Sequence, residues 1–294
     1  MASAVNWKNP YADRLGEWLK GNLHTHTSPA SACGSQPSAE VIELYWQKGY
    51  QFLSVSDHMA LSEIAESRGM TWIPGIEWNS EAGEHTGIFT GDRAQLSEMI
   101  GIQVHDDLLK RLSGTDALVI LNHPNWQAVP HYSREALHRK IPYDGIEIFN
   151  AVIGRLVGNP DSTDKWDHLL SQGRRVLGFA SDDSHRATDI GRAWLCVRAA
   201  KRTPEAVIQA IKQGNFYCSS GIIFSDIRRE NAAIHVESDN AEEIMATGVD
   251  GRVIKTVKER QMTLELGGLD TPYVRFTARG CPAIMGWTQP FFLK

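Results

Sequence analysis

Six of the eleven histidines lie in short polar clusters, and most of these clusters follow an apolar run that is typical of a strand. The clusters are His24-Thr25-His26, Asp57-His58, His85, Asn122-His123-Pro124 and Asp183-Ser184-His185, and Glu77 occupies a further predicted strand end. Imidazole nitrogens and carboxylate oxygens are common metal ligands. If the strands lie side by side, their last residues meet at one rim. We therefore expect a polynuclear metal centre there, and such a centre favours hydrolysis.

The first two clusters predict different geometries. His24 and His26 are two residues apart, so a strand would point both imidazoles to one face; two polar residues in a tight turn are the alternative. Asp57 and His58 are adjacent and would point to opposite faces. We assign His58 as the ligand and Asp57 as a catalytic residue that hydrogen-bonds a ligand or the attacking water. A solvated turn is the alternative for this pair.

The next two candidates follow one another closely. Glu77 ends the run Trp72–Ile76, and a carboxylate at that position can bridge two cations, as in two-metal hydrolases. A structural salt bridge is the alternative. His85 begins the run Thr86–Thr90 and is either a ligand or an exposed loop histidine.

The last clusters repeat the pattern. His123 follows an aliphatic run, and Pro124 stiffens the turn just past it. Asp183 and His185 are again two residues apart after a predicted strand, whereas the adjacent Asp182 should face away. Both clusters therefore add ligands to the same predicted rim.

The composition of this set indicates which ions it suits. Five neutral imidazoles and two carboxylates favour zinc, manganese or iron over an all-oxygen magnesium or calcium site. One ion would provide metal-bound hydroxide as nucleophile, and a second would polarise the scissile ester. The sequence has no G-x-x-x-x-G-K-[ST] loop, no H-E-x-x-H and no G-x-S-x-G. No nucleotide cofactor is therefore expected.

Alternating strands and helices over the first two-thirds of the chain predict an α/β fold with a parallel sheet or barrel. Pro37–Lys48 has proline in its first turn and glycine beyond its end, so it is a predicted helix, as are Leu96–Leu112 and Asp164–Gln172. The predicted strands are Gly21–His24, Phe52–Ser56, Trp72–Glu77, Thr86–Thr90, Ala117–Asn122, Gly145–Phe149, Arg175–Ala180 and Ala193–Arg198.

The pattern changes after residue 202. Thr203 is the predicted N-cap of a short helix that stops at Gly214. Short alternating segments separated by turns follow, as in an antiparallel β-sandwich. We therefore predict a hydrolase domain over residues 1–214 and a small β-sandwich-like domain over residues 215–294, packed together.

Composition limits the partners. The formal charge is −5 and no long basic run is present, which argues against long nucleic acid as the main partner. The four cysteines, Cys33, Cys196, Cys218 and Cys281, form no C-x-x-C pair. No signal peptide and no membrane-spanning run is visible. We expect a cytoplasmic protein without a membrane partner.

Five motifs together resemble the PHP (polymerase and histidinol phosphatase) family of metal-dependent phosphoesterases. They are Asn22–Ser28, Ser54–His58, Gly75–Glu77, Asn122–Pro124 and Ser181–His185, in the family's order between about residues 20 and 195. The resemblance implies a distorted (β/α)7 barrel with two or three divalent metals at the strand ends. It implies ligand roles for His24, His26, His58, Glu77, His123, Asp183 and His185, and for His85 if Glu84–Gly87 matches the family's His-x-x-Gly segment.

One departure concerns the third metal. Many members of the family carry Ser-Asp-Gly after the H-x-H, whereas this chain has Ala32-Cys33-Gly34. Either Cys33 binds a soft metal as thiolate, or the third site is weak or absent.

The leading functional hypothesis is hydrolysis of a phosphate mono- or diester of a small metabolite or short nucleotide. Arg186 and Arg192 follow His185 and are candidate phosphate ligands, with Arg155 as a third; surface solvation is the alternative for all three. Amidohydrolase-type cleavage of a C–N or C–O bond is a second hypothesis, since fold does not dictate reaction. A non-enzymatic metal-bearing interaction module is a third.

Overall fold

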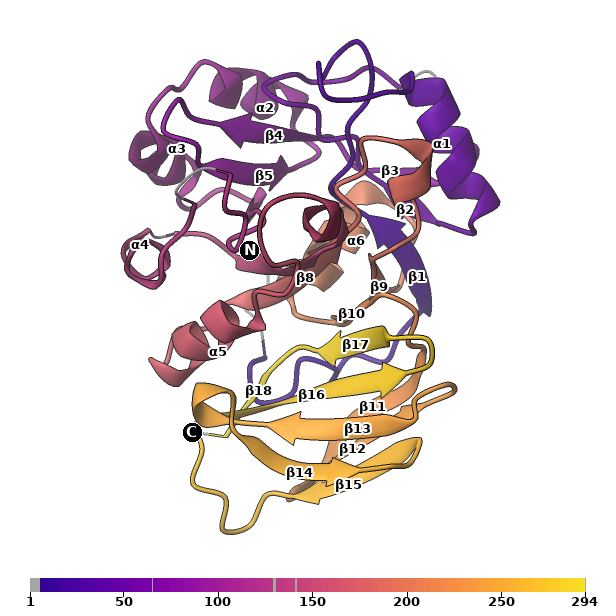
Figure 1. The fold of residues 1–294 in the computed structure, drawn as a ribbon, viewed down its shortest axis with the longest axis vertical. Helices are drawn as coiled ribbons and strands as arrows, with labels where there is room; N and C mark the ends of the chain where they lie inside the picture. Colours follow the sequence, from indigo (N-terminus) through magenta and orange to yellow (C-terminus); the bar gives the residue numbers. More distant parts are fainter. Residues whose placement is uncertain (1–5, 65, 129–130, 141, 294) are drawn as a thin grey trace.

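Strands carry most of the architecture, and they form three sheets with helices on their outer faces (Figure 1). The computed structural model describes residues 6–64, 66–128, 131–140 and 142–293. Strands and helices alternate up to residue 212, and the chain beyond it is almost entirely β. The fold is therefore mixed α/β, and no closed barrel is present in these ranges.

The largest sheet joins strands from both ends of the chain. Its parallel part comprises β1 (Glu17–Asn22), β2 (Phe52–Leu53) and β3 (Thr71–Trp72). Antiparallel strands continue it beyond β1 in the order β9 (Trp194–Ala199), β10 (Phe216–Ser219), β17 (Ile284–Thr288), β16 (Tyr273–Gly280), β13 (Glu243–Thr247) and β14 (Val253–Val257), and β18 (Phe291–Phe292) pairs with β16. One sheet thus runs through the expected boundary at residues 214 and 215, so the two-domain division stays a prediction.

The second sheet contains five strands. Its order follows the sequence: β4 (Gly75–Asn79), β5 (His85–Phe89), β6 (Leu118–Leu121), β7 (Gly145–Asn150) and β8 (Leu177–Ser181). β5 pairs antiparallel with both β4 and β6, whereas β7 pairs parallel with both β6 and β8. Because β5 runs opposite to β4 and β6, its first residue lies at the edge where those strands end.

Backbone hydrogen bonds join the two sheets at that edge. The amide of Glu77 in β4 donates to the Ser56 carbonyl beyond β2 (3.2 Å), and the amide of His26 beyond β1 donates to the Ser184 carbonyl beyond β8 (2.9 Å). The strand ends therefore follow one another around a common rim although the sheets themselves remain separate. This arrangement provides the convergence that the ligand pattern requires.

Helices cover the outer faces. They are α1 (Ser38–Gln47), α2 (Arg93–Ile100), α3 (His105–Leu112), α4 (Arg134–Arg139), α5 (Thr163–Ser171) and α6 (Pro204–Lys212). Thr203 caps α6 by accepting a hydrogen bond from the Ala206 amide, which confirms that predicted cap.

The predicted single helix Leu96–Leu112 is wrong. The chain leaves the helix at Gly101 and re-enters it after Val104, whose backbone is extended. Two short helices can each turn an apolar face to the same core cluster, where Leu96 and Met99 meet Leu108, Leu109 and Leu112. Packing thus outweighs the continuity suggested by the sequence pattern.

The C-terminal strands enclose a core of their own. The third sheet, β11 (Phe224–Glu230), β12 (Ala233–Ser238) and β15 (Gln261–Glu265), is antiparallel throughout. Its inward residues Ile227, Ile234 and Val236 join Ile244 and Phe276 from the large sheet in one cluster. Figure 1 shows these strands as a layered orange and yellow unit below the α/β part. The expected antiparallel β region is therefore present.

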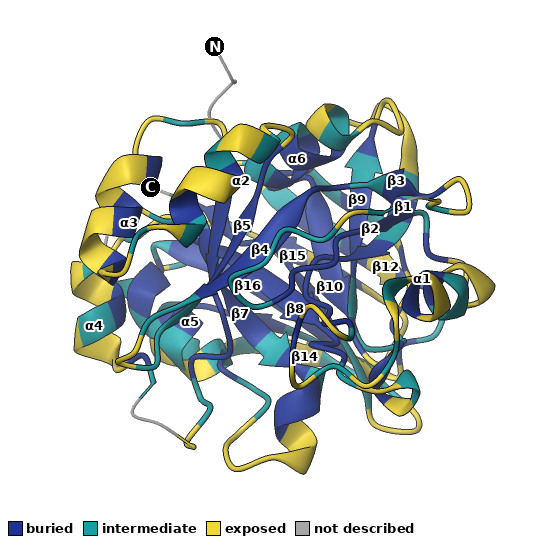
Figure 2. Cartoon of the chain, turned by 90° about the horizontal axis from the view of Figure 1, so that it is seen from above, coloured by how far each residue is buried: buried dark blue, intermediate teal, exposed yellow. Residues whose placement is uncertain are grey.

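Burial follows these layers. In Figure 2 the central strands are dark blue, while the helices turn yellow faces outward. Trp166 of α5 is fully buried, and its indole N–H donates to the Val176 carbonyl (3.0 Å). All four cysteines are free thiols.

Among the described residues, no helix combines the length and apolar character needed to cross a bilayer.

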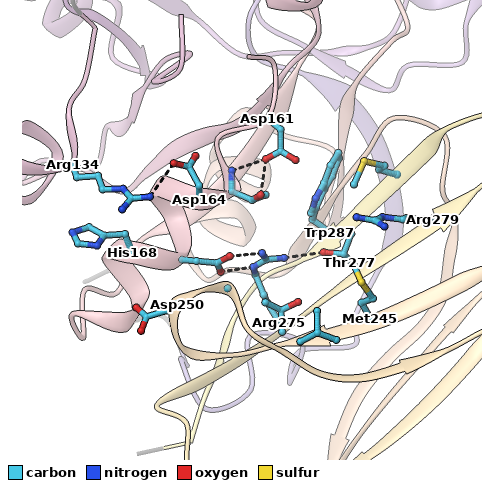
Figure 3. A pocket seen from close by; sticks show the side chains of 16 residues that line it. Arg134, Asp161, Asp164, His168, Met245, Asp250, Arg275, Thr277, Arg279 and Trp287 are labelled. Carbon is cyan, nitrogen blue, oxygen red and sulfur yellow. Dashed lines mark hydrogen bonds and ion pairs between the residues drawn. The ribbon is translucent and has the colours of Figure 1, made fainter. Parts of the chain in front are cut away.

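A buried ion pair connects the α/β part to the C-terminal strands (Figure 3). Arg275 of β16 donates to both carboxylate oxygens of Asp167 in α5, at 2.7 and 2.6 Å, and also to Thr277. The Tyr273 hydroxyl adds a further hydrogen bond to Asp167 (2.9 Å). Both charged side chains are 6% exposed. A cavity of about 450 Å³ lies beside this pair, and its lining includes none of the candidate metal ligands.

We expect Asp167→Asn to destabilise the protein by about 3–5 kcal/mol, because it leaves the Arg275 guanidinium buried without its counter-charge. Urea denaturation measures this free energy of unfolding. Asp164→Asn, on the same helix, is the matched control. Its pairing with Arg134 is about half exposed, so its removal should change stability by less than about 0.5 kcal/mol. Equal effects of the two substitutions would contradict the assignment.

Candidate metal centre

Eight side chains from distant parts of the sequence meet at the rim where the two sheets are joined. They are His24, His26, His58, Glu77, His85, His123, Asp183 and His185. Together they form four overlapping groups, and within each group the ligand atoms lie within 4.8 Å of one another. His85, for which the sequence left two alternatives, lies inside the cluster because β5 is antiparallel. The structure therefore brings together all eight residues expected to bind metal.

Glu77 lies at the centre of this cluster. Its Oε1 lies 3.1 Å from His24 Nε2, 3.1 Å from His85 Nδ1 and 3.2 Å from His123 Nε2. Its Oε2 lies 3.3 Å from His26 Nε2 and 3.2 Å from His58 Nδ1. A carboxylate that faces different imidazoles with its two oxygens has the geometry of a bridging ligand.

Asp183 forms a second centre on the opposite side of His24 and His26. Its Oδ1 lies 3.2 Å from His24 Nε2, 3.1 Å from His26 Nε2 and 3.6 Å from His185 Nδ1. His26, His58 and His185 together make a group of imidazoles without a carboxylate. The donors are thus distributed over more than one position that could hold an ion.

Unpaired donor atoms test whether these residues fit a metal. Within the described chain, His24 Nε2, His26 Nε2, His58 Nδ1 and Asp183 Oδ1 are buried and make no hydrogen bond. They approach one another closely, yet without the alignment that a shared proton would give. Buried polar atoms are rarely left without a partner. Nitrogen and oxygen donors of this kind suit a divalent first-row ion, so the residues fit the metal that the ligand pattern implies.

The electrostatics of the cluster favour positive charge. Burial opposes ionisation of Glu77, but His24, His85 and His58 outweigh it and hold the pKa of this carboxyl well below its usual range. Burial likewise opposes protonation of His26, yet Asp183 and Glu77 raise its pKa to about 9. At the more exposed edge, burial lowers the pKa of His58 to about 4. The cluster thus contains carboxylates that stay ionised and require cations beside them.

Two of the ligand residues have unusual backbone conformations. His123 has φ 30° and Asp183 has φ 49°, in the left-handed region that side chains other than glycine rarely adopt. Such strain persists only where surrounding contacts impose it, and it is concentrated at functional sites. Each is the second residue beyond a strand, His123 after β6 and Asp183 after β8, where the chain turns at the rim.

Glu147, in the middle of β7, is a functional residue that sequence reasoning missed. Its carboxylate accepts hydrogen bonds from His24 Nδ1 (2.8 Å), the His123 amide (2.8 Å) and Asn150 Nδ2 (2.8 Å). The bond to Nδ1 leaves the Nε2 lone pair of His24 directed at the cluster. A charged residue inside the apolar run Gly145–Phe149 was the signal that could have indicated this role.

Two amides also hold the carboxylates. Asn122 Nδ2 donates to Glu77 Oε1 (2.8 Å), and Asn150 Nδ2 donates to Asp183 Oδ2 (3.1 Å). Asn122 is the neighbour of His123 in the sequence, and Asn150 is the last residue of β7. Both fix the direction in which a ligand carboxylate faces.

Asp57 lies beside the cluster rather than in it. Its carboxylate accepts from the Thr27 amide (2.6 Å), the Thr27 hydroxyl (2.7 Å), the Ser31 hydroxyl (2.7 Å) and the Ser62 hydroxyl. These contacts fasten the turn after His26 to the segment that carries His58. Asp57 is not among the residues that line the cavity at the cluster. Its predicted catalytic role stays a prediction, and the geometry describes a positioning contact.

The structure places the three arginines away from the cavity lining. Arg186 and Arg192 are exposed, and Arg192 Nε donates to the Thr188 carbonyl (2.8 Å). Arg155 makes two hydrogen bonds to Asp189, at 3.1 and 2.8 Å. Its charge is therefore already paired.

Two further residues from the sequence analysis, Asp182 and Cys33, lie outside the donor groups, as expected for Asp182. Asp182 faces away, accepting from the amides of Gly191, Arg192 and Ala193. Cys33 is exposed and belongs to none of the four donor groups. Although the residue as a whole is exposed, partial desolvation of its thiol and the nearby Asp183 raise the pKa of Cys33 to about 11. Both alternatives for the third site stay open.

We expect His123→Ala to lower the metal content of the purified protein by at least one equivalent while the far-UV circular dichroism stays unchanged, because the imidazole offers a ligand rather than core packing. His24→Ala should behave in the same way. Elemental analysis measures the loss. His138→Ala, an exposed histidine of α4, is the control and should retain all bound metal. Full occupancy in both ligand variants would refute the assignment.

Glu147→Gln tests the supporting carboxylate. The amide cannot accept from His24 Nδ1 as strongly, so we expect metal affinity to fall about 10–100-fold without loss of a ligand. Competition with a fluorescent chelator measures this affinity. Glu98→Gln, on the exposed face of α2, should leave the affinity unchanged.

Comparisons with known proteins bear on the fold. No family model matches the sequence, and no curated protein matches it. A two-domain protein from Bacteroides vulgatus, described as containing a predicted PHP-like metal-dependent phosphoesterase, superposes with a TM-score of 0.54 and 15% identity, over 100% of this chain and 90% of that one. The lesion-specific endonuclease EndoQ from Pyrococcus furiosus superposes with a TM-score of 0.53 and 16% identity, over 66% of this chain.

The match covers 56% of the endonuclease, so this chain spans about half of that protein's length. An amidohydrolase from Chromobacterium violaceum, with bound sulfate and no metal, superposes with a TM-score of 0.43 and 13% identity, over 56% of this chain and 87% of that one. The first superposition extends over the C-terminal strands as well as the α/β part. At these identities the likeness concerns architecture, and the chain shares its fold with the PHP-like protein of Bacteroides vulgatus.

Proposed function

We propose that this protein is a metal-dependent hydrolase that cleaves phosphate mono- or diesters of a small metabolite or short nucleotide. The observation that carries the proposal is the convergence of six imidazoles and two carboxylates. Among them, buried atoms of His24, His26, His58 and Asp183 have no hydrogen-bond partner in the described structure. The fold shared with a PHP-like phosphoesterase structure and with an endonuclease structure supports phosphate esters as the substrate class.

In this proposal the residues of the centre have different roles. Bound divalent ions would supply an activated water and a Lewis acid for the phosphoryl oxygen. Glu77 and Asp183 hold the negative charge that keeps such ions in place, and Glu147 fixes the tautomer of His24. Asn122 fixes the direction of the Glu77 carboxylate, and Asp57 holds the turn that follows His26.

The cavity supports a small substrate. It holds about 60 Å³, and Trp126, Ile153 and Leu156 form its apolar side. No lysine or arginine lines it among the described residues. A long anionic polymer is usually bound along a basic surface. With a formal charge of −5, this protein suits a small phosphorylated partner better.

The finer architectural expectations remain part of the proposal. We propose that the strand ends act as the C-terminal rim of a distorted (β/α)7 barrel, opened between β3 and β4 and between β8 and β1. The superposition on the PHP-like structure supports this description. Two or three zinc, manganese or iron ions are the corresponding expectation.

An assay of aryl alcohol release, which reports on both phosphate monoesters and diesters, tests the proposal. Protein loaded with the ions found on purification should hydrolyse an aryl phosphate mono- or diester, and a chelator should abolish the activity until the ion is restored. Glu77→Gln should lower kcat/KM at least about a hundredfold, or more than about 2.7 kcal/mol of transition-state stabilisation. The carboxylic ester and anilide of the same aryl group are the controls. Turnover of the anilide but of no phosphate ester, with metal fully loaded, would overturn the proposal in favour of an amidohydrolase.

A further inference from the structure

Two nitrogen-bearing side chains beside the metal centre have no role in the site described so far. They are Trp126 and His131, on the loop that follows His123. The ring of Trp126 lies 5.2 Å from His123 and 5.5 Å from His85, centroid to centroid. The ring of His131 lies 4.8 Å from His123 and 5.6 Å from Trp126. Both therefore pack directly on the imidazoles that face Glu77.

Their nitrogens are buried and unpaired. Trp126 Nε1 and both ring nitrogens of His131 make no hydrogen bond to any described residue. An indole N–H is always a donor, and an imidazole carries an N–H in either tautomer. Burial holds the pKa of the His131 ring well below its ordinary value, and the nearby Asn122 backbone opposes this only in part. A buried donor without an acceptor costs about 1–3 kcal/mol.

Contacts with the rest of the fold hold the described residues of this loop. Lys165 of α5 donates to the carbonyls of Pro124 and Tyr132, at 2.5 Å each, and so fastens both ends of the loop. A short antiparallel bridge pairs Trp126 with Gly158. Gly158 has φ +146°, and a Cβ there would lie 2.6 Å from the Asn125 carbonyl oxygen, so the bridge requires glycine. The scaffold thus presents Trp126 in one position.

An anion is the ligand that this arrangement suits. Trp126 lines the same cavity as the metal ligands, and His131, which is not among the lining residues, packs on two that are, Trp126 and His123. No fixed cationic side chain lines the cavity in the described chain. Arg155 lies between the lining residues Ile153 and Leu156 in the sequence, but it is paired with Asp189. Non-bridging phosphoryl oxygens that extend beyond the ions therefore need neutral donors.

We infer that the indole N–H of Trp126 and an imidazole N–H of His131 bind the phosphoryl oxygens of the substrate. This inference rests on the proposed function, because it assigns the donors that recognise phosphate at the same centre. The two side chains take the place that arginines were expected to occupy. They act by binding and orientation and donate hydrogen bonds without transferring a proton.

The experiment uses full-length, metal-loaded protein and inorganic phosphate as the probe. Calorimetry measures phosphate affinity, and elemental analysis measures metal content. We expect Trp126→Phe, which removes only the N–H side of the ring, and His131→Leu each to weaken phosphate binding about tenfold, the loss of one hydrogen bond to a charged group. Metal content should stay unchanged, and His131→Gln should recover part of the affinity because its amide restores a donor.

Trp72→Phe is the matched control, because the indole nitrogen of Trp72 is also buried and unpaired but the ring packs in the core beside α1. It should leave phosphate affinity unchanged. Unchanged affinity in Trp126→Phe and His131→Leu would overturn the inference, as would loss of metal from His131→Leu, which would make His131 a ligand. Phosphate binding that depends on both residues in a protein that hydrolyses no phosphate ester would remove the proposed function alone.

Discussion

The centre of this structure depends on the need to balance buried negative charge. Glu77, Asp183 and Glu147 are each at least 95% buried within one space, and burial by itself would neutralise a carboxyl. No lysine or arginine enters the described cavity to compensate them. The imidazoles that surround Glu77 and Asp183 offer lone pairs or protons, so the charge is balanced either by protonated histidines or by cations held between the ligands. The spacing and direction of every ligand follow from that requirement.

The topology meets this requirement without a closed barrel. Backbone hydrogen bonds join the two sheets at the rim, between Glu77 of β4 and the segment beyond β2, and between the segments beyond β1 and β8. Reversal of β5 brings His85 to the same edge, where a parallel strand would have carried it to the other end. The left-handed backbone at His123 and Asp183 shows that the chain accepts local strain to complete the set. Hydrogen bonds from His24 and His123 to Glu147, and from Asn122 to Glu77, hold these side chains in position.

The C-terminal strands stand in a different relation to the site. They extend the large sheet through β9, β10 and β17, and the buried pair of Asp167 and Arg275 ties them to α5. The same helix carries Lys165, which fastens the loop of Trp126 and His131. Helix α5 thus links the β layer to the loop beside the metal centre. A buried ion pair adds little net stability but makes loss of either partner costly, which favours one arrangement of the two parts.

Sequence alone identified the eight residues that meet at the rim, because strand ends preceded by apolar runs and followed by turn residues are local signals. The N-cap of α6 and the position of the antiparallel β region are local for the same reason. Tertiary structure alone decided the direction of β5, the break after α2 and the division of the strands between sheets, because these depend on packing between distant segments. It also decided the roles of Glu147, Trp126 and His131. Glu147 stands inside an apolar run, and Trp126 and His131 follow His123 without matching a ligand pattern of their own. The contacts that bring all three to the centre form only in the folded chain.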